Sequence, residues 1–171
     1  MDYLIHILIL VAIYAIMAVG LNLVVGYTGL LSVTTAAFYG MGAYTVAILM
    51  TEHGMNFFMA LILAMAIEAV VSLLIGLILS KFRGDYYTLG TIGFNVIIYS
   101  VFLNWQSLTR GPLGIPGIGR PYLFGLDFSS NGLFLVLSLV LLAIVYAVAR
   151  FTVKSSFGRV LKAIREDEKV I

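Results

Sequence analysis

The sequence predicts an all-α polytopic membrane protein, and three observations lead to this fold class. Hydrophobic residues make up 62% and charged residues only 11% of the 171 residues, whereas a soluble domain carries about 25% charged residues. The apolar residues gather in five runs, each close to the ~20 residues that a membrane-spanning helix needs. The basic residues stand mostly at the ends of these runs. Because so few charges cannot cover a surface in water, lipid is the expected surrounding.

The predicted spans form a transmembrane helical domain over residues 1–150. Their approximate limits are 3–26, 30–50, 57–79, 86–105 and 132–150. The first lacks a basic region and a small-residue cleavage site before it, so we expect it to be retained. The longest connection, 106–131, contains all three prolines of the chain. Its apolar residues favour packing over the mouth of the helix bundle or against an external partner, and a plain connector is the alternative.

The distribution of basic residues predicts the orientation of the spans. Lys81 and Arg83 precede the fourth span, and a basic tail follows the fifth, so an even number of spans separates them. With that face cytoplasmic, eight of the ten Lys and Arg residues lie inside, as the positive-inside rule requires. The N-terminus and the 106–131 connection are then outside. Residues 151–171 form a cytoplasmic amphipathic segment.

The sequence offers no residues for covalent or metal-assisted chemistry. It contains no cysteine and only two histidines, and no P-loop, nucleophile elbow or zincin motif occurs in it. We therefore expect no catalytic residues, no metal and no cofactor. A conduit or a scaffold is favoured over an enzyme.

The second span is rich in small and hydroxyl residues. Two pairs of small residues stand four positions apart, Ala36 with Gly40 and Ala43 with Ala47. This spacing lets membrane helices approach closely. Thr34 and Thr35 add hydroxyl groups that either face a polar pathway or bond back to their own helix.

Glu68 lies in the middle of the third span, where a carboxylate is expensive to insert. No basic residue is predicted at a similar depth, so Glu68 is expected to be protonated, hydrogen-bonded to a group such as Asn22 or Asn95, or exposed to a wet cavity. A role in a pathway is one interpretation, and helix association is the other. Asn95 is a candidate for the same pathway and for an interhelical hydrogen bond.

Two further helix ends carry recognisable signals. Asp85, within an Arg-Gly-Asp triplet, is expected to cap the fourth span, because its charge suits the positive end of the helix dipole. In the tail, Ser155 or Ser156 is expected to cap a short helix. The apolar face of that helix has helical spacing and consists of Phe157, Val160, Leu161 and Ile164.

Four segments together resemble a known family. They read LNLVVGYTGLLSVTTAAFYGMGAY, RGDYYTLGTIGF, LTRGPLGIPGI and SSFGRVLKAIREDE. In this order and at these separations, they resemble the permease subunit of branched-chain amino-acid ABC transporters. The chain departs from the pattern at Thr34–Thr35, where relatives often carry Gly-His. The family also continues with further spans, so the resemblance implies the N-terminal half of an ABC importer permease fold.

The resemblance implies a subunit of an ATP-driven importer in the prokaryotic inner membrane. Its partners would be a second, homologous permease, two cytoplasmic ABC ATPases and an extracytoplasmic solute-binding protein, with no nucleic acid involved. The binding protein would dock near Arg110 and Arg120. The residues expected to face the ATPases are Arg159, Arg165, Glu166 and Asp167.

Three alternatives remain at this stage. Close relatives of this family transport urea or short amides, so the cargo is open. A truncated, non-transporting membrane scaffold would also fit the chain. A secondary transporter would need ion-coupling residues in unwound helices, and Glu68 alone is available for that role.

Overall fold

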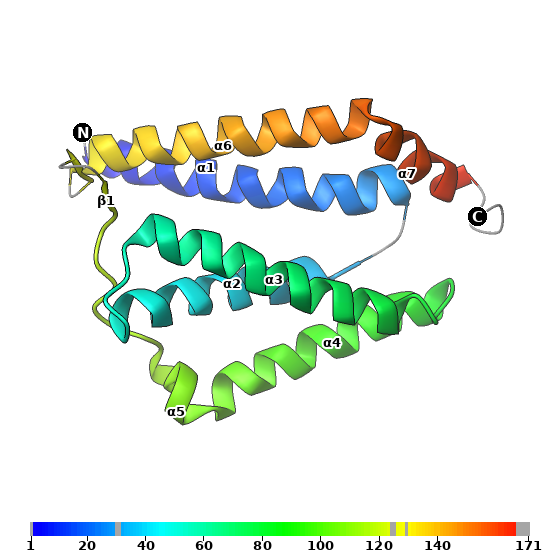
Figure 1. Ribbon diagram of the computed structural model, residues 1–171, viewed down its shortest axis with the longest axis horizontal. Helices are drawn as coiled ribbons and strands as arrows, with labels where there is room; N and C mark the ends of the chain where they lie inside the picture. The colour runs from blue at the N-terminus through cyan, green and yellow to red at the C-terminus, as the bar shows by residue number, and fades with distance from the viewer. Residues whose placement is uncertain (1, 30–31, 124–125, 129, 167–171) are drawn as a thin grey trace. The chain divides into compact units, whose positions relative to one another are not determined.

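The computed structural model describes residues 2–29, 32–123, 126–128 and 130–166, and these are mostly helical (Figure 1). The long helices are α1 (Asp2–Leu21), α2 (Thr34–Thr51), α3 (Phe57–Leu79), α4 (Asp85–Asn104) and α6 (Asn131–Lys154). The short elements are a π-turn, η1 (Asn22–Gly26), the helices α5 (Gln106–Thr109), η2 (Gly111–Leu113) and α7 (Ser156–Glu166), and the strands β1 (Tyr122–Leu123) and β2 (Leu126–Asp127). The predicted all-α polytopic class is confirmed, although the prediction missed the small antiparallel hairpin, in which Tyr122 pairs with Asp127.

Four of the predicted spans coincide with helices that are long and apolar enough to cross a membrane. Their limits are Tyr3–Gly26, Phe57–Leu79, Asp85–Asn104 and Asn131–Lys154. The predicted span 30–50 corresponds to α2, which is not in this group. Its 18 residues include four threonines, two tyrosines and two glycines, which lower its hydropathy. At 1.5 Å per residue it is about 27 Å long, slightly less than a hydrocarbon core of ~30 Å.

The helices form two compact units, which we describe separately. The first contains Met1–Leu31 and Phe128–Ile171, and the second contains Ser32–Asp127. The first unit thus joins the two ends of the sequence, whereas the second is continuous. Within the first unit, α6 continues to Lys154, four residues past the predicted limit of the fifth span.

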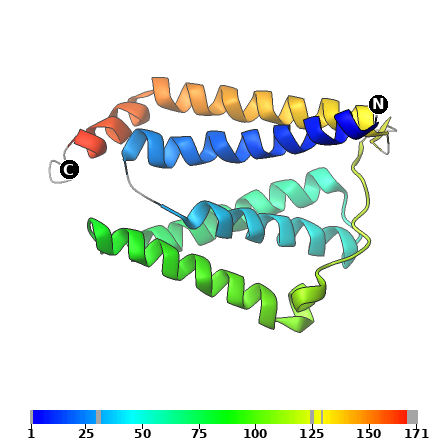
Figure 2. The same cartoon turned by 180° about the vertical axis from the view of Figure 1, so that it is seen from behind.

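In the first unit, α1 and α6 pack side by side and run in the same direction (Figures 1 and 2). The residues that line a cavity between them confirm the direction. Leu23 and Tyr27 lie just beyond the C-terminal end of α1, and Ala149 and Val153 lie at the C-terminal end of α6. The buried apolar residues of this pair are few, namely Ile9, Ala12, Leu137 and Ala149.

In the second unit, α2, α3 and α4 alternate in direction, and their contacts depend on small residues (Figures 1 and 2). A Cβ atom added at Gly40 would lie 2.7 Å from the ring of Phe102 on α4. Phe102 also stacks on Tyr44, one turn further along α2, at a centroid distance of 4.5 Å. The predicted role of the small residues in helix packing is therefore confirmed at Gly40. Ala37 and Ala47 are buried as well, whereas Ala36 and Ala43 are exposed.

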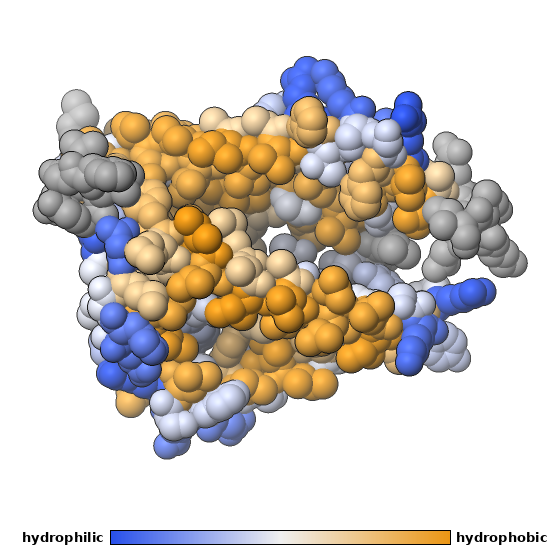
Figure 3. Space-filling model, in the orientation of Figure 1, coloured by the Kyte–Doolittle hydropathy of each residue, from blue (hydrophilic) through white to orange (hydrophobic). Residues whose placement is uncertain are grey.

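The burial pattern is the reverse of that of a soluble protein. Alanine supplies most of the buried apolar residues, while many large aliphatic side chains on the same helices are exposed. Hydrophobic residues extend along the helices, and hydrophilic residues gather near their ends (Figure 3). Lipid tails surround large apolar side chains as favourably as a protein interior does. The contacts between these helices are therefore stabilised mainly by the close approach of their backbones.

The predicted cap of α4 is wrong in one respect. The N-cap residue is Gly84, at φ 55°, and no side chain caps the helix. Asp85 is the first residue inside α4. Only glycine adopts such a conformation without strain, so Gly84 makes the turn after α3. The carboxylate of Asp85 still lies in the first turn, where the helix dipole favours it.

The parallel packing of α1 and α6 constrains the membrane topology. Two helices that cross a bilayer in the same direction must be separated by an odd number of crossings. Between α1 and α6 lie the two apolar spans α3 and α4. We therefore infer that α2 makes the third crossing, which gives five spans, the number predicted from the sequence.

This topology predicts the sides of two short loops. The chain contains no cysteine, so His53→Cys, after α2, and Ser80→Cys, after α3, each supply a single thiol. In intact cells, a membrane-impermeant maleimide should label the thiol of the His53→Cys variant and leave that of the Ser80→Cys variant unlabelled, because the loops are on opposite faces. Permeabilised cells provide the control, since both thiols must then react. Equal labelling of both variants in intact cells would contradict a crossing by α3.

Candidate functional site

A large cavity lies between α2 and α3. Its volume is about 710 Å³, within the range of ligand pockets in proteins. Most of the lining is apolar or aromatic, from Phe38, Tyr39, Gly42, Ala43, Val46, Ala47, Phe57, Leu61, Ala64, Met65, Ala69 and Ile118. The polar members are Glu68 and Ser72, one turn apart on α3. Ile118 comes from the 106–131 connection, so part of that connection contributes to the lining of the cavity.

Glu68 also lines a second, smaller cavity. That cavity has a volume of about 280 Å³ and lies among α2, α3, α4 and α5. Of the residues that the structure describes, Glu68 alone lines both cavities. Its half-buried carboxyl group therefore stands at the boundary between them. A group bound at this carboxyl is within reach of either space.

Gly42 lets the Glu68 side chain approach α2. A Cβ atom added at Gly42 would lie 3.5 Å from Oε1 of Glu68. This is an ordinary van der Waals contact, so alanine would fit here but larger side chains would meet the carboxyl group. From the sequence, Gly42 was grouped with the other small residues of α2, and that grouping predicted helix packing only. Its role in giving space to a carboxyl group was not predicted.

Glu68 has no basic neighbour on the surrounding helices. Neither α2, α3 nor α4 carries a lysine or arginine. Among the described residues no hydrogen bond joins Glu68 to Asn95, which was one predicted partner. An acidic group in a mainly apolar cavity, without a fixed counter-ion, is suited to a cationic or hydrogen-bond-donating ligand.

The other predicted path residues lie outside both cavities. Thr34 begins α2, and its hydroxyl group lies 2.8 Å from that of Ser32. Thr35 follows it on the same turn, and Asn95 is half-buried on α4. None of these three residues lines either cavity. Glu68 alone of the four combines a polar group with open space, and a path role for all four residues stays a prediction.

The N-terminal end of α2 is held by α4. The hydroxyl group of Thr91, which is fully buried, donates to the carbonyl of Thr88 and accepts a hydrogen bond of 3.4 Å from the amide of Val33. Thr91 lies in the segment RGDYYTLGTIGF, but the sequence gave no specific reason to select it. The contact positions the first turn of α2 and, through it, the wall of the cavity.

The 106–131 connection begins with a tight turn. The buried hydroxyl group of Thr109 donates to the carbonyls of Phe102 and Trp105 at 2.7 and 2.8 Å. Arg110 follows in a left-handed conformation at φ 60°, which is unusual for a residue with a side chain. Arg110 is exposed on this turn. Arg120 is also exposed.

The tail forms the predicted short helix, α7. Ser155 ends α6, and its hydroxyl group accepts a hydrogen bond of 3.2 Å from the amide of Phe157, so Ser155 is the predicted cap. Gly158 is buried against the end of α6. A Cβ atom there would collide with the carbonyl of Val153. The sharp angle between α6 and α7 therefore depends on glycine at this position, which sequence reasoning did not single out.

The predicted ATPase-facing residues have different surroundings. Arg159 donates a hydrogen bond of 3.0 Å to the hydroxyl group of Ser156. Arg165 donates one of 3.1 Å to the carbonyl of Gly26, in the π-turn after α1, although its side chain stays exposed. Glu166 is the last residue of α7. Asp167 lies outside the described residues.

The junction between α6 and α7 yields a testable prediction. Gly158→Ala should loosen α7, because the new methyl group must displace the carbonyl of Val153. Overpacking of this kind costs about 1–3 kcal/mol. Hydrogen exchange of residues 156–166 should become faster. Gly132→Ala, near the start of α6, is the matched control, since its nearest contact would be an ordinary 3.8 Å. Unchanged exchange in Gly158→Ala would show that α7 adjusts without loss.

The comparisons with known proteins agree on one family. The family model described as the branched-chain amino acid transport system / permease component matches residues 3–171. The chain is 35% identical, over 91% of its length, to the high-affinity branched-chain amino acid transport system permease protein LivM of Salmonella typhimurium. It is 34% identical, over 93% of its length, to the protein of the same description in Escherichia coli K12. No solved structure matches the chain.

The chain therefore belongs to the branched-chain amino acid transport permease family. It is a multi-pass protein of the prokaryotic inner membrane. It spans less than half the length of the curated relatives it matches, 42% of one and 43% of the other.

Proposed function

We propose that this chain forms part of the permease subunit of an ATP-driven importer for branched-chain amino acids. The family match across residues 3–171 carries the proposal. In it, the permease lines the translocation path together with a second, homologous permease. The chain has no nucleotide-binding motif of its own, so two cytoplasmic ATPases would supply the energy.

The cavity around Glu68 supports the choice of cargo. A branched-chain amino acid combines an apolar side chain with an ammonium group. The α2–α3 cavity combines an apolar wall, including Val46, Leu61 and Met65, with a single carboxyl group. Urea has no apolar part to match this wall, and a short amide has only a small alkyl group. The lining therefore favours the amino acid over the alternative cargo.

The positions of the charged residues fit the proposed partners. In the five-span topology, Arg110 and Arg120 lie on the outer face, where a solute-binding protein would dock. Arg159, Arg165 and Glu166 lie on the cytoplasmic face, where the ATPases would dock.

The role of Glu68 can be tested by transport in the complete permease. Glu68→Gln should raise the KM for leucine uptake roughly tenfold or more, because a hydrogen bond to a charged group is worth about 1.5–3 kcal/mol. Glu52→Gln is the matched control, since Glu52 is exposed just after α2 and lines neither cavity. Normal uptake by Glu68→Gln would exclude Glu68 from the path and leave the importer proposal standing.

The importer proposal itself is tested by the energy source. Uptake of labelled leucine by the complete set of subunits should stop when the ATPases are inactivated by substitution of the P-loop lysine. It should also stop when the binding protein is omitted. The control is the amount of permease in the membrane, which must be equal in all three samples. Uptake that persists without ATP hydrolysis would contradict the proposal.

A further inference from the structure

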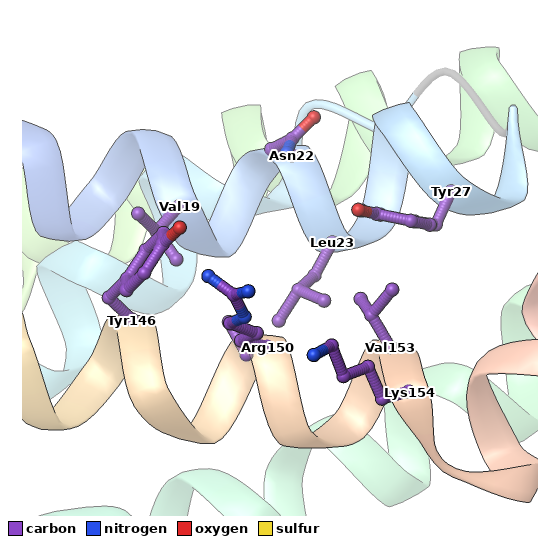
Figure 4. A pocket seen from close by; sticks show the side chains of 9 residues that line it. Val19, Asn22, Leu23, Tyr27, Tyr146, Arg150, Val153 and Lys154 are labelled. Atoms are coloured by element: carbon purple, nitrogen blue, oxygen red, sulfur yellow. The ribbon is translucent and has the colours of Figure 1, made fainter.

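A groove between α1 and α6 holds two basic side chains at the end of the helices. Its volume is about 330 Å³. Figure 4 shows the side chains of Arg150 and Lys154 entering the space between the two helices. Tyr27 and Tyr146 lie on either side of Arg150 along the groove. All of these residues belong to the first compact unit.

The two cations share one face of α6 and lack a carboxylate on the walls of the groove. They stand four residues apart, one helical turn. No Asp or Glu occurs in α6, and α1 carries one only at Asp2, at its opposite end. Among the described residues neither cation has an ion-pair partner. Two like charges one turn apart repel each other, so the groove is electrostatically complementary to an anion.

The groove lies at the depth of lipid headgroups. α6 crosses the membrane as Asn131–Lys154, so Lys154 ends the apolar span. Tyrosine is enriched at this level, because its ring is apolar and its hydroxyl group polar. Val19, Leu23 and Val153 complete the lining with apolar side chains. The groove thus offers cations to a headgroup and an apolar wall to the adjoining glycerol and acyl carbons.

The wall of the groove is also locally irregular. Leu23 belongs to the π-turn Asn22–Gly26, and such turns within helices occur frequently at functional sites. Arg165, on α7, donates a hydrogen bond to the carbonyl of Gly26 and so stabilises the turn. A defined backbone distortion, rather than a regular helix surface, therefore shapes one side of the groove.

We propose that this groove binds the phosphate group of one anionic phospholipid of the surrounding leaflet, with Arg150 and Lys154 as its ligands. Basic pockets between membrane helices bind anionic headgroups in this way. The phosphate diester would accept hydrogen bonds from both cations, and its chains would follow the apolar side of the helices. The site is separate from the Glu68 cavity, and it does not depend on the identity of the cargo.

The test uses the complete permease, purified in detergent, and three probes. These are phosphatidylglycerol, phosphatidylcholine with the same acyl chains, and inorganic phosphate. Native mass spectrometry measures the bound lipid, and thermal unfolding measures the stabilisation. Phosphatidylglycerol should bind in preference to phosphatidylcholine. Arg150→Gln with Lys154→Gln should weaken phosphatidylglycerol binding on the order of 30-fold, the effect of two basic residues near an anionic surface.

Two control variants separate a site from general attraction and from misfolding. Lys81→Gln with Arg83→Gln removes the same charge from the turn after α3 and should leave binding nearly unchanged. Arg150→Lys with Lys154→Arg keeps both charges and should retain binding. Equal losses in both glutamine pairs, or equal binding of the two lipids, would overturn the proposal. Equal stabilisation by inorganic phosphate at the same concentration would make this a free-phosphate site and overturn the lipid assignment.

Discussion

The structure depends on a constraint that lipid imposes on helix packing. In water, a helix is stabilised when its large apolar side chains are buried. In a bilayer, lipid tails already surround those side chains, so burying them adds little. Helices then associate where their backbones can approach. The buried residues of this chain follow that rule, with Ala60 and Thr91 fully enclosed while many leucines and isoleucines face outward. Gly40, in contact with Phe102, provides such an approach between α2 and α4.

The same constraint explains why polar groups concentrate at a few positions. A hydroxyl or carboxyl group inside the membrane must be satisfied locally. Thr45 and Ser138 donate to carbonyls of their own helices, which requires no partner helix. Thr91 and Thr109 instead join separate segments and fix the ends of α2 and α4. Glu68 differs from all of these, because it lies between two cavities, and this is why it is the strongest candidate for contact with a ligand.

The sequence predicted the architecture better than it predicted the site. Hydropathy alone located four spans to within a few residues, since the length of an apolar run follows from the bilayer thickness. The sequence pattern also gave Ser155 as one of two candidate caps and Glu68 as the central intramembrane acid. It did not find Gly158 or Gly84, because the need for glycine arises from contacts or backbone angles that no local pattern encodes. Thr34, Thr35 and Asn95 were selected by polarity, and polarity alone could not reveal that they lie outside the cavities.

The pairing of α1 with α6 has a consequence for the order in which the protein is made. About 110 residues separate the two helices, and that intervening segment includes the whole second unit. During synthesis, domains fold in order from the N-terminus. The second unit is continuous in sequence, so all its contacts are available as soon as its own residues have been inserted. α1 enters the membrane before the second unit and packs against α6 only after α6 has been synthesised. α1 is thus synthesised before the helices of the second unit but reaches its packing partner after they have formed their own contacts.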